Sequence, residues 1–457
     1  MTTHHGQRGG RETFPLSFGQ EKTYWGLRQG GIPAHSLHAS LRIDGPLNAI
    51  AFNTALHTMV LRHDALRLRI APGPSGLPGQ WLAAPPDPAS VLTRTLVKSG
   101  SETQFITYAA RVGEGEFSRP WRLAENPHFR FTLLRFSPEV HAFLANFPRV
   151  TVDGRSRAVF LRELWQTYTD VRNGGPTPGR SGDLPASIRR QRERFAHRSA
   201  TTNLAYWTSK FQAIESGSPR SEDASGDDSD GPPRLPLTRD FTLRGEELLA
   251  FRSNCRASTS TAFQWALARF AAEIFRITSR PHIDVLVPMD TRETADLALM
   301  GRFAITMPLL VHRSDEPAGI LRNVKAEMMQ TMRHRHLRYA DLERARASRR
   351  TSVSRRRGVV TAAYDEHTED RSVAMTGGVV ATSEAIPLRL VRMSDGIDLA
   401  VNDFGRRLEV TVRFDPRDHD DAAADEFIVR LAGALVTPLA TTAAVPDVAA
   451  RPEGTVR

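Results

Sequence analysis

The stretch from residue 140 to residue 171 limits the possible folds of this 457-residue chain more than any other. Residues 140–147 are mostly apolar, which predicts a buried strand. A short loop follows at 148–154, and from Ser156 onward apolar residues recur at helical spacing until an Asn-Gly-Gly-Pro stop. A loop between a buried strand and a helix presents side chains from a rigid scaffold. Residues 148–154 are therefore the first place to look for chemistry.

Composition places the chain among globular proteins with room for two domains, since 40% of residues are hydrophobic and 25% are charged. The one cysteine, Cys255, excludes an intramolecular disulfide and makes a reducing cytoplasm the default expectation. Cys255 has no base beside it in the sequence and is expected to be an inert thiol. The N-terminus is polar, and no apolar run is long enough for a membrane span, so no signal peptide and no membrane partner are expected.

The formal net charge of +10 favours acidic partners. The densest basic run lies at 349–357 and is interpreted as a solvated loop. Nucleic-acid binding would require interleaved aromatic residues or a recognition motif, and neither accompanies this run. Nucleic acid is therefore not an expected partner.

Hydrophobic periodicity predicts an α+β fold in two halves. Residues 1–172 form the first half, with strands expected at 37–43, 66–70 and 129–136, a helix over 52–63, and a Pro/Gly-rich loop at 71–88. Residues 237–457 form the second, with helices expected at 261–277, 318–332 and 427–439, strands at 283–287 and 305–311, and a hairpin of 397–401 with 408–414. Residues 173–236 are predicted to be a linker that contains a helix at about 188–212 and a disordered acidic insertion at 215–233.

A series of short motifs runs in a recognisable order along the chain. They are Phe-Pro-Leu-Ser-Phe-Gly-Gln at 14–20, Arg-His-Asp-Ala-Leu-Arg at 62–67, Asp-Gly at 153–154, Tyr-Trp at 206–207, Val-Pro-Met-Asp-Thr-Arg at 287–292, Gly-Arg-Phe with Thr-Met-Pro-Leu at 301–309, and a segment at 334–342 that begins with histidine. Together they resemble the condensation domain family of nonribosomal peptide synthetases, which belongs with the chloramphenicol-acetyltransferase-like acyltransferases.

The resemblance implies two chloramphenicol-acetyltransferase-like lobes in a V, each a mixed sheet backed by helices, with a tunnel between them. It implies that carrier proteins bring acyl and aminoacyl thioesters into this tunnel on phosphopantetheine arms, and that no metal or bound cofactor takes part. Family members join the donor acyl group to an acceptor amine or alcohol. No adenylation or carrier motif was found beside these motifs, so the chain is expected to act in trans, as a stand-alone member.

The family's active loop reads His-His-x-x-x-Asp-Gly, and this chain departs from it. Asp153 and Gly154 align, but Pro148 and Arg149 stand at the two histidine positions. The second histidine is credited with deprotonating or orienting the attacking nucleophile, and arginine cannot act as a base because its pKa exceeds about 12. His141 lies too far back along the predicted strand to replace it.

The resemblance assigns the candidate catalytic positions to Arg149, Asp153 and Gly154, and a buried ion pair to Asp153 and Arg292. Arg149 could instead pair with Asp153 and close the site. His63 and His334 are expected to pack or to end helices, and the Tyr-Trp pair at 206–207 to pack in the core. Gly154 either lets the backbone approach substrate or serves as a plain turn residue.

Two functions stay open. The first is an acyltransferase that relies on proximity, with Arg149 or backbone groups stabilising the oxyanion. The second is a catalytically silent relative that binds carrier proteins or recruits a tailoring enzyme. Arg149 favours silence, because loss of a general base lowers rates by about 10² to 10⁴, whereas the intact Asp153-Gly154 pair favours a maintained tunnel.

Overall fold

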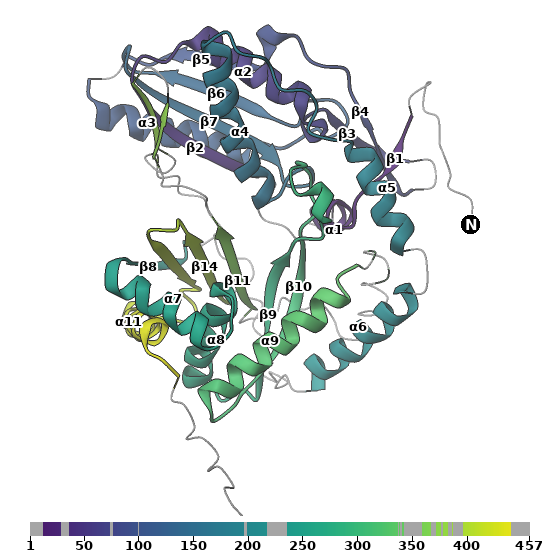
Figure 1. Cartoon of the computed structure of the whole chain (residues 1–457), viewed down its shortest axis with the longest axis vertical. Coiled ribbons are helices and arrows are strands. Elements are labelled where there is room, and N and C mark those ends of the chain that lie inside the picture. The colour runs from purple at the N-terminus through teal and green to yellow at the C-terminus, as the bar shows by residue number, and fades with distance from the viewer. Residues whose placement is uncertain are drawn as a thin grey trace, which may run out of the picture.

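The computed structural model describes residues 12–28, 36–73, 76–98, 100–195, 199–216, 235–336, 338, 341, 359–366, 372–375, 378–382, 386 and 396–439. These residues form two lobes arranged as a V, and each lobe contains a six-stranded sheet with helices packed on it (Figure 1). The α+β class predicted from the sequence is confirmed. No described helix is both long and apolar enough to cross a bilayer.

The first lobe and the connection after it contain β1 (Phe14–Pro15), α1 (Phe18–Arg28), β2 (Ser36–Asp44), α2 (Ala49–Arg62), β3 (Leu68–Pro72), β4 (Pro78–Leu82), β5 (Leu92–Leu96), α3 (Glu102–Ser118), β6 (Arg130–Arg135), β7 (Val140–Pro148), α4 (Gly154–Arg172), α5 (Leu184–Phe195) and α6 (Ser199–Ser216). The second half contains β8 (Leu237–Leu243), α7 (Gly245–Ala257), α8 (Ala262–Ile277), β9 (His282–Met289), β10 (Ile305–His312), α9 (Pro317–Arg333), β11 (Val359–Glu366), β12 (Ser372–Met375), β13 (Val379–Thr382), β14 (Gly396–Asp403), β15 (Leu408–Phe414) and α11 (Asp421–Val436).

The N-terminal lobe is built around β7, in the sheet order β12-β13-β2-β7-β6-β5. β7 pairs antiparallel with β2 along its whole length and with β6 on its other side. Phe143 of β7 packs with Phe52 of α2 and, through it, with Trp165 of α4, while Ala142 and Leu144 face the side covered by α3. Because both faces of β7 are covered, most of its residues are apolar, and the polar exceptions His141 and Asn146 are buried as well.

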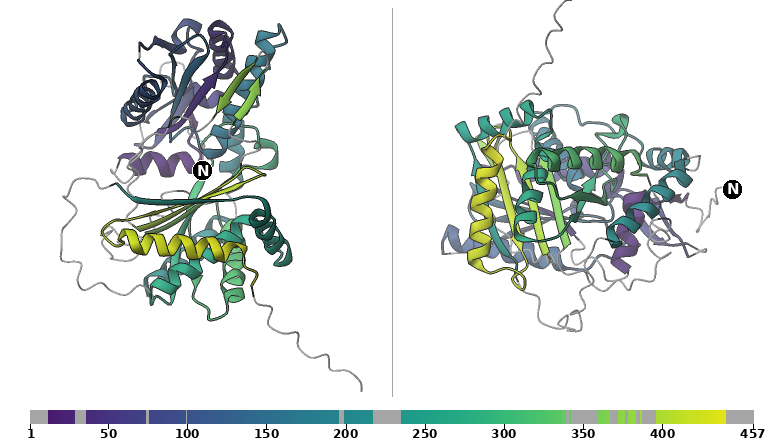
Figure 2. Two further views of the ribbon diagram at one scale, coloured as in Figure 1. Left: turned by 90° about the vertical axis from the view of Figure 1, so that its left-hand side faces the viewer. Right: turned by 90° about the horizontal axis from the view of Figure 1, so that it is seen from below.

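The C-terminal lobe has the sheet order β10-β9-β11-β14-β15-β8. Helices α7, α8, α9 and α11 bury one face of this sheet in a single core. Buried and half-buried residues alternate along β14 and β15, as expected for strands with one covered face. The half-buried face is turned toward the N-terminal lobe, as Figure 2 (left) shows with α11 on the opposite side of the sheet. The predicted hairpin of these two strands is confirmed.

Two of the sequence-based expectations need correction. The predicted loop at 71–88 contains β4, which joins β1 and β3 in a small antiparallel sheet. The helix predicted at about 188–212 is two helices, α5 and α6. Most of the predicted acidic insertion at 215–233 and all of the basic run at 349–357 lie outside the described residues.

The division at residue 237 also needs correction, because β12 and β13 belong to the sheet of the N-terminal lobe. β13 pairs antiparallel with β2, with Val380 opposite Asp44 and Thr382 opposite Arg42. Strands of four residues carry little local signal, and their place is set by the free edge of β2 that they cover. The second half of the chain is thus part of both lobes.

Candidate active site

The candidate site is built where β7 ends and α4 begins. Asp153 is the N-cap of α4, and its Oδ1 accepts a hydrogen bond from the Ser156 amide at 2.9 Å. The helix therefore starts at Gly154, two residues earlier than the sequence pattern indicates. Asp153 is the cap and Ser156 is the third helical residue, a common N-terminal arrangement.

Asp153 forms a bidentate ion pair with Arg292, which follows β9 in the other lobe. The Arg292 Nη1 and Nη2 atoms lie 2.8 Å and 2.9 Å from Asp153 Oδ2 and Oδ1. The two side chains are 1% and 0% exposed, so the pair is fully buried. This is the partner that the family resemblance implied for Asp153.

Three further donors complete the surroundings of Asp153. The amides of Phe303 and Ala304 donate to Oδ2 at 3.0 Å and 3.1 Å, and the Ser156 hydroxyl lies 2.8 Å from Oδ1. Ser156 Oγ also accepts from the Gly301 amide at 2.9 Å. Asp153, Ser156, Arg292 and the backbone of residues 301–304 are called the Asp153 cluster below.

The electrostatics of the cluster keep Asp153 ionised. Burial alone would raise the pKa of this carboxyl, but the charge and hydrogen bonds of Arg292 outweigh burial and hold the pKa well below its usual range. With six donors around two oxygens, the carboxylate has no remaining acceptor site for a substrate proton. Asp153 therefore joins the lobes and shapes the loop, and it does not act as an acid or base.

Arg149 lies in the turn between β7 and α4 and is partly buried. It makes contacts of its own, but the contacts of Asp153 are those given above, so the suggested Arg149–Asp153 pair is not formed. His141 stands at the opposite end of β7, roughly 25 Å away at 3.3 Å per residue. Burial and the charge of Arg135 lower the pKa of His141. His141 does not supply the missing base.

The remaining histidines and the aromatic pair of the motifs have structural roles, as predicted. His63 is buried at the end of α2, with Nε2 3.0 Å from a Glu163 oxygen. His334 caps α9 and stacks on Tyr206 at 4.2 Å, and its carbonyl accepts from Trp207 Nε1.

Cys255 is buried, and burial raises the pKa of its thiol to about 11, which makes it unreactive at neutral pH.

Gly154 brings a further residue into the site that the sequence did not indicate. A Cβ placed on Gly154 would lie 3.3 Å from Oδ1 of Asp365, at the end of β11 in the C-terminal lobe. This separation is tighter than ordinary van der Waals contact, so the glycine allows the carboxylate to approach the start of α4. No sequence motif surrounds Asp365, and only the fold shows that it faces the loop.

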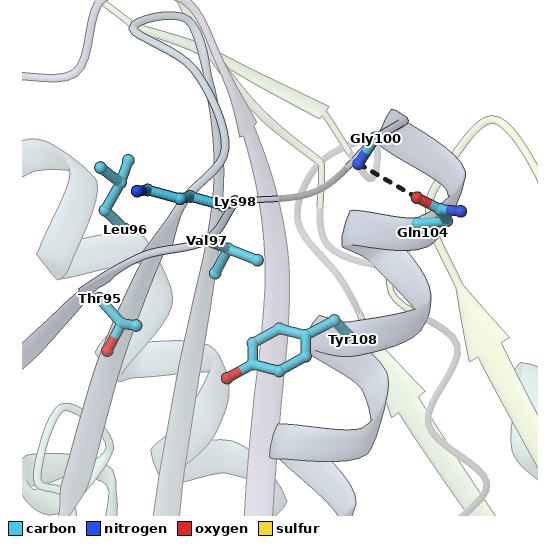
Figure 3. Close-up of a pocket in the computed structure, with 7 residues that line it drawn as sticks. All are labelled: Thr95, Leu96, Val97, Lys98, Gly100, Gln104 and Tyr108. Carbon is cyan, nitrogen blue, oxygen red and sulfur yellow. Dashed lines mark hydrogen bonds between the residues drawn. The ribbon is translucent and has the colours of Figure 1, made fainter.

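A surface pocket of about 390 Å³ lies at the outer edge of the N-terminal lobe. Figure 3 shows its lining by the end of β5, the loop after it, and Tyr108 of α3, with the Gly100 amide bound to Gln104. Through the sheet register, Leu96 of β5 aligns with Arg135 and then with His141. The pocket is therefore at the end of β7 away from Arg149 and does not belong to the site.

Comparisons with known proteins agree with this architecture. The family model described as "Condensation domain" matches residues 11–361. The phosphinothricin tripeptide synthetase PhsC of Streptomyces viridochromogenes is 28% identical over 331 residues, which is 70% of this chain and 29% of that protein. The chain spans 4% to 29% of the length of the first curated relatives that it matches.

Solved structures show the same fold at low identity. The first condensation domain of the calcium-dependent antibiotic synthetase superimposes with a TM-score of 0.72 at 19% identity, covering 94% of this chain and 98% of that one. The X-domain from teicoplanin biosynthesis gives a TM-score of 0.70 at 17% identity, with 94% and 95% covered. With these matches and the Asp153 cluster joining two acetyltransferase-like lobes, the chain belongs to the condensation domain family of nonribosomal peptide biosynthesis.

Proposed function

We propose that this protein binds carrier-protein-bound acyl and aminoacyl thioesters of a nonribosomal peptide or related secondary-metabolite pathway, acts on them in trans, and lacks histidine-dependent catalysis. The substrates would enter a tunnel between the lobes on phosphopantetheine arms, with no bound cofactor. The observation that carries the proposal is the complete Asp153 cluster beside Arg149. The machinery that shapes the loop is retained, and the base has been replaced.

Any condensation chemistry here has to come from positioning and electrostatics. An arginine stays protonated at neutral pH and donates hydrogen bonds, so Arg149 suits a developing oxyanion and cannot accept the proton of a nucleophile. Well-oriented reactants can supply a large part of the rate enhancement without a base. We therefore expect slow amide or ester formation compared with relatives that keep the histidine.

A catalytically silent platform is the second candidate. It would bind carrier proteins or recruit a tailoring enzyme, and the absence of the motif histidine favours it. The fold likeness to the teicoplanin X-domain is compatible with this reading but is equally strong for condensation domains.

Intact-protein mass spectrometry separates the two candidates. The purified chain is mixed with separate donor- and acceptor-loaded carrier proteins, and mass transfer is followed for the wild type, Arg149→His and the exposed control Arg122→His. Transfer by the wild type excludes the silent platform. Transfer by Arg149→His alone shows that only the base is missing. Carrier binding without transfer by any variant supports the platform and removes the enzyme proposal.

A further inference from the structure

Among the described residues, Asp365 is an acidic residue that approaches the Arg149–Gly154 turn without an ion-pair partner. Strand β11 runs parallel to β14 in the middle of the C-terminal sheet, with Asp365 opposite Asn402. Val360 and Ala362 are buried in the core under the helices. Side chains alternate along a strand, so Asp365 projects from the opposite face, which is turned toward the N-terminal lobe (Figure 2).

Tyr364, its neighbour, supports this direction. The Tyr364 ring packs on the helix-covered core, and its hydroxyl donates to Asp403 Oδ2 at 2.5 Å. Asp403 is also held by Arg252 at 2.5 Å. The strand end is thereby fixed from the core side, and this fixes the backbone that carries Asp365.

Gly154 leaves room for the Asp365 carboxylate. The Asp365 Oδ1 atom lies so near the Gly154 backbone that a Cβ on residue 154 would be 3.3 Å from it. The carboxylate thus reaches across from one lobe to the first residue of α4 in the other. It stands next to the loop on which the family places its nucleophile-handling histidine.

Asp365 differs from the other acidic groups around this loop. Asp153 is saturated by six donors, and Asp290 pairs with Arg292 at 3.0 Å. Asp365 is partly exposed and forms no hydrogen bond or ion pair with any residue in the described ranges. A carboxylate placed between two lobes, with no partner among the described residues, suits a cationic or hydrogen-bond-donating ligand.

We propose that Asp365 binds the amine nitrogen of the acceptor substrate and so performs the orienting task for which the motif histidine is absent. This rests on the proposed function and narrows it, because it makes the acceptor an amine. In the reaction the nitrogen attacks the thioester carbonyl, the C–N bond forms and the C–S bond breaks. The proton released by nitrogen passes to the leaving thiolate, and Asp365 only holds the amine in position.

The test uses two stable probes that differ only by an amino group: an L-alanyl pantetheine amide and its propionyl counterpart. Their affinities for the full chain are measured by calorimetry or ligand-observed NMR. We expect the wild type to prefer the amine probe by about tenfold, as fits one charge-assisted hydrogen bond. Asp365→Asn should abolish this preference and leave propionyl binding unchanged. It is isosteric and removes no contact within the described residues, so the fold should be kept.

The matched control is Asp240→Asn on β8, an exposed acid of the same sheet that should keep the preference. If Asp365→Asn retains the tenfold preference, Asp365 does not bind the amine and the inference is wrong. The proposed function, binding of substrates in the tunnel, is not affected by that result. If neither probe binds the wild type, the proposed function fails and the inference fails with it.

Discussion

A single buried carboxylate determines how the two lobes meet. Asp153 caps α4 in one lobe and receives Arg292 and two backbone amides from the other. Removing one partner of a buried ion pair leaves the other charged and desolvated, which costs more than the pair itself contributes. The cluster is therefore a requirement of the assembled fold, whatever chemistry the loop performs.

Asp153→Asn should lower the free energy of unfolding by about 3 to 5 kcal/mol at pH 7, because Arg292 is left buried without a counterion. Urea unfolding followed by tryptophan fluorescence measures this. Asp170→Asn near the end of the same helix is the control: asparagine can still accept the hydrogen bond from Gln166, so stability should change by less than about 0.5 kcal/mol. Equal losses in both variants would mean that the cluster has no special role.

The pH dependence of the free energy of unfolding should also report the contribution of ionised Asp153. The folded pKa of Asp153 lies below its unfolded value, so its contribution is fully present above the unfolded value, about 3.9, and is lost as pH falls below it. The stability difference between wild type and Asp153→Asn should be constant from about pH 8 to pH 5 and narrow below about pH 4. A difference that widens on acidification would contradict the assignment.

Gly154→Ala tests the contact with Asp365. The added methyl would press on Oδ1, so the carboxylate must move, while the helix itself tolerates alanine at its first residue. We expect a stability change within about 1 kcal/mol and loss of the preference for the amine probe. Retained preference would show that the approach of Asp365 to Gly154 is not needed for binding.

At the scale of elements, the sequence predicted helices and strands that have a strong apolar pattern of their own. It did not predict those whose pattern is weak or whose position depends on a distant partner. The β7 strand and the α4 helix were predicted because apolar residues fill most of their covered positions. Helix α3 was not predicted, since it buries few residues, including Phe105 and Phe117, and contains two glycines that weaken the helical pattern. Strands β12 and β13 depend on a partner far away in the sequence.

The candidate site divides in the same way. The strand-loop-helix pattern indicated the loop at 148–154, and the family resemblance implied the pairing of Asp153 with Arg292. The role of Asp365 could not be predicted, because its approach to Gly154 depends on how the two sheets are placed. No sequence pattern near either residue indicates that approach. Ser156 was read as a helix start, although its hydroxyl bridges the lobes through Gly301.

Gly45→Ala tests the docking of β13 on β2. Gly45 has φ of +102°, and a Cβ there would lie 2.4 Å from the Gly378 carbonyl oxygen. We expect a loss of about 1 to 3 kcal/mol and faster amide exchange at residues 379–382. Gly115→Ala in α3, where nothing lies within 4 Å of the added methyl, should be neutral or stabilising by up to about 1 kcal/mol. Unchanged exchange in Gly45→Ala would contradict this account.

At the scale of the whole molecule, the net charge of +10 should act on partner encounter. If the partners are acidic carrier proteins, attraction raises the association rate, and salt screens it. Stopped-flow binding should show the association rate falling by about tenfold between roughly 20 mM and 500 mM NaCl, with a smaller change in dissociation. An association rate insensitive to salt would exclude electrostatic steering.

The pairing of β13 with β2 also has a consequence during synthesis. These strands are separated by roughly 340 residues, so at about 5 to 20 residues per second the ribosome needs roughly 20 to 70 seconds to deliver the second strand after the first. Throughout that interval the edge of β2 is without its neighbour, which is a template for association between nascent chains. In a fragment of residues 1–172 expressed alone, β13 is missing and this edge of β2 would stay uncovered.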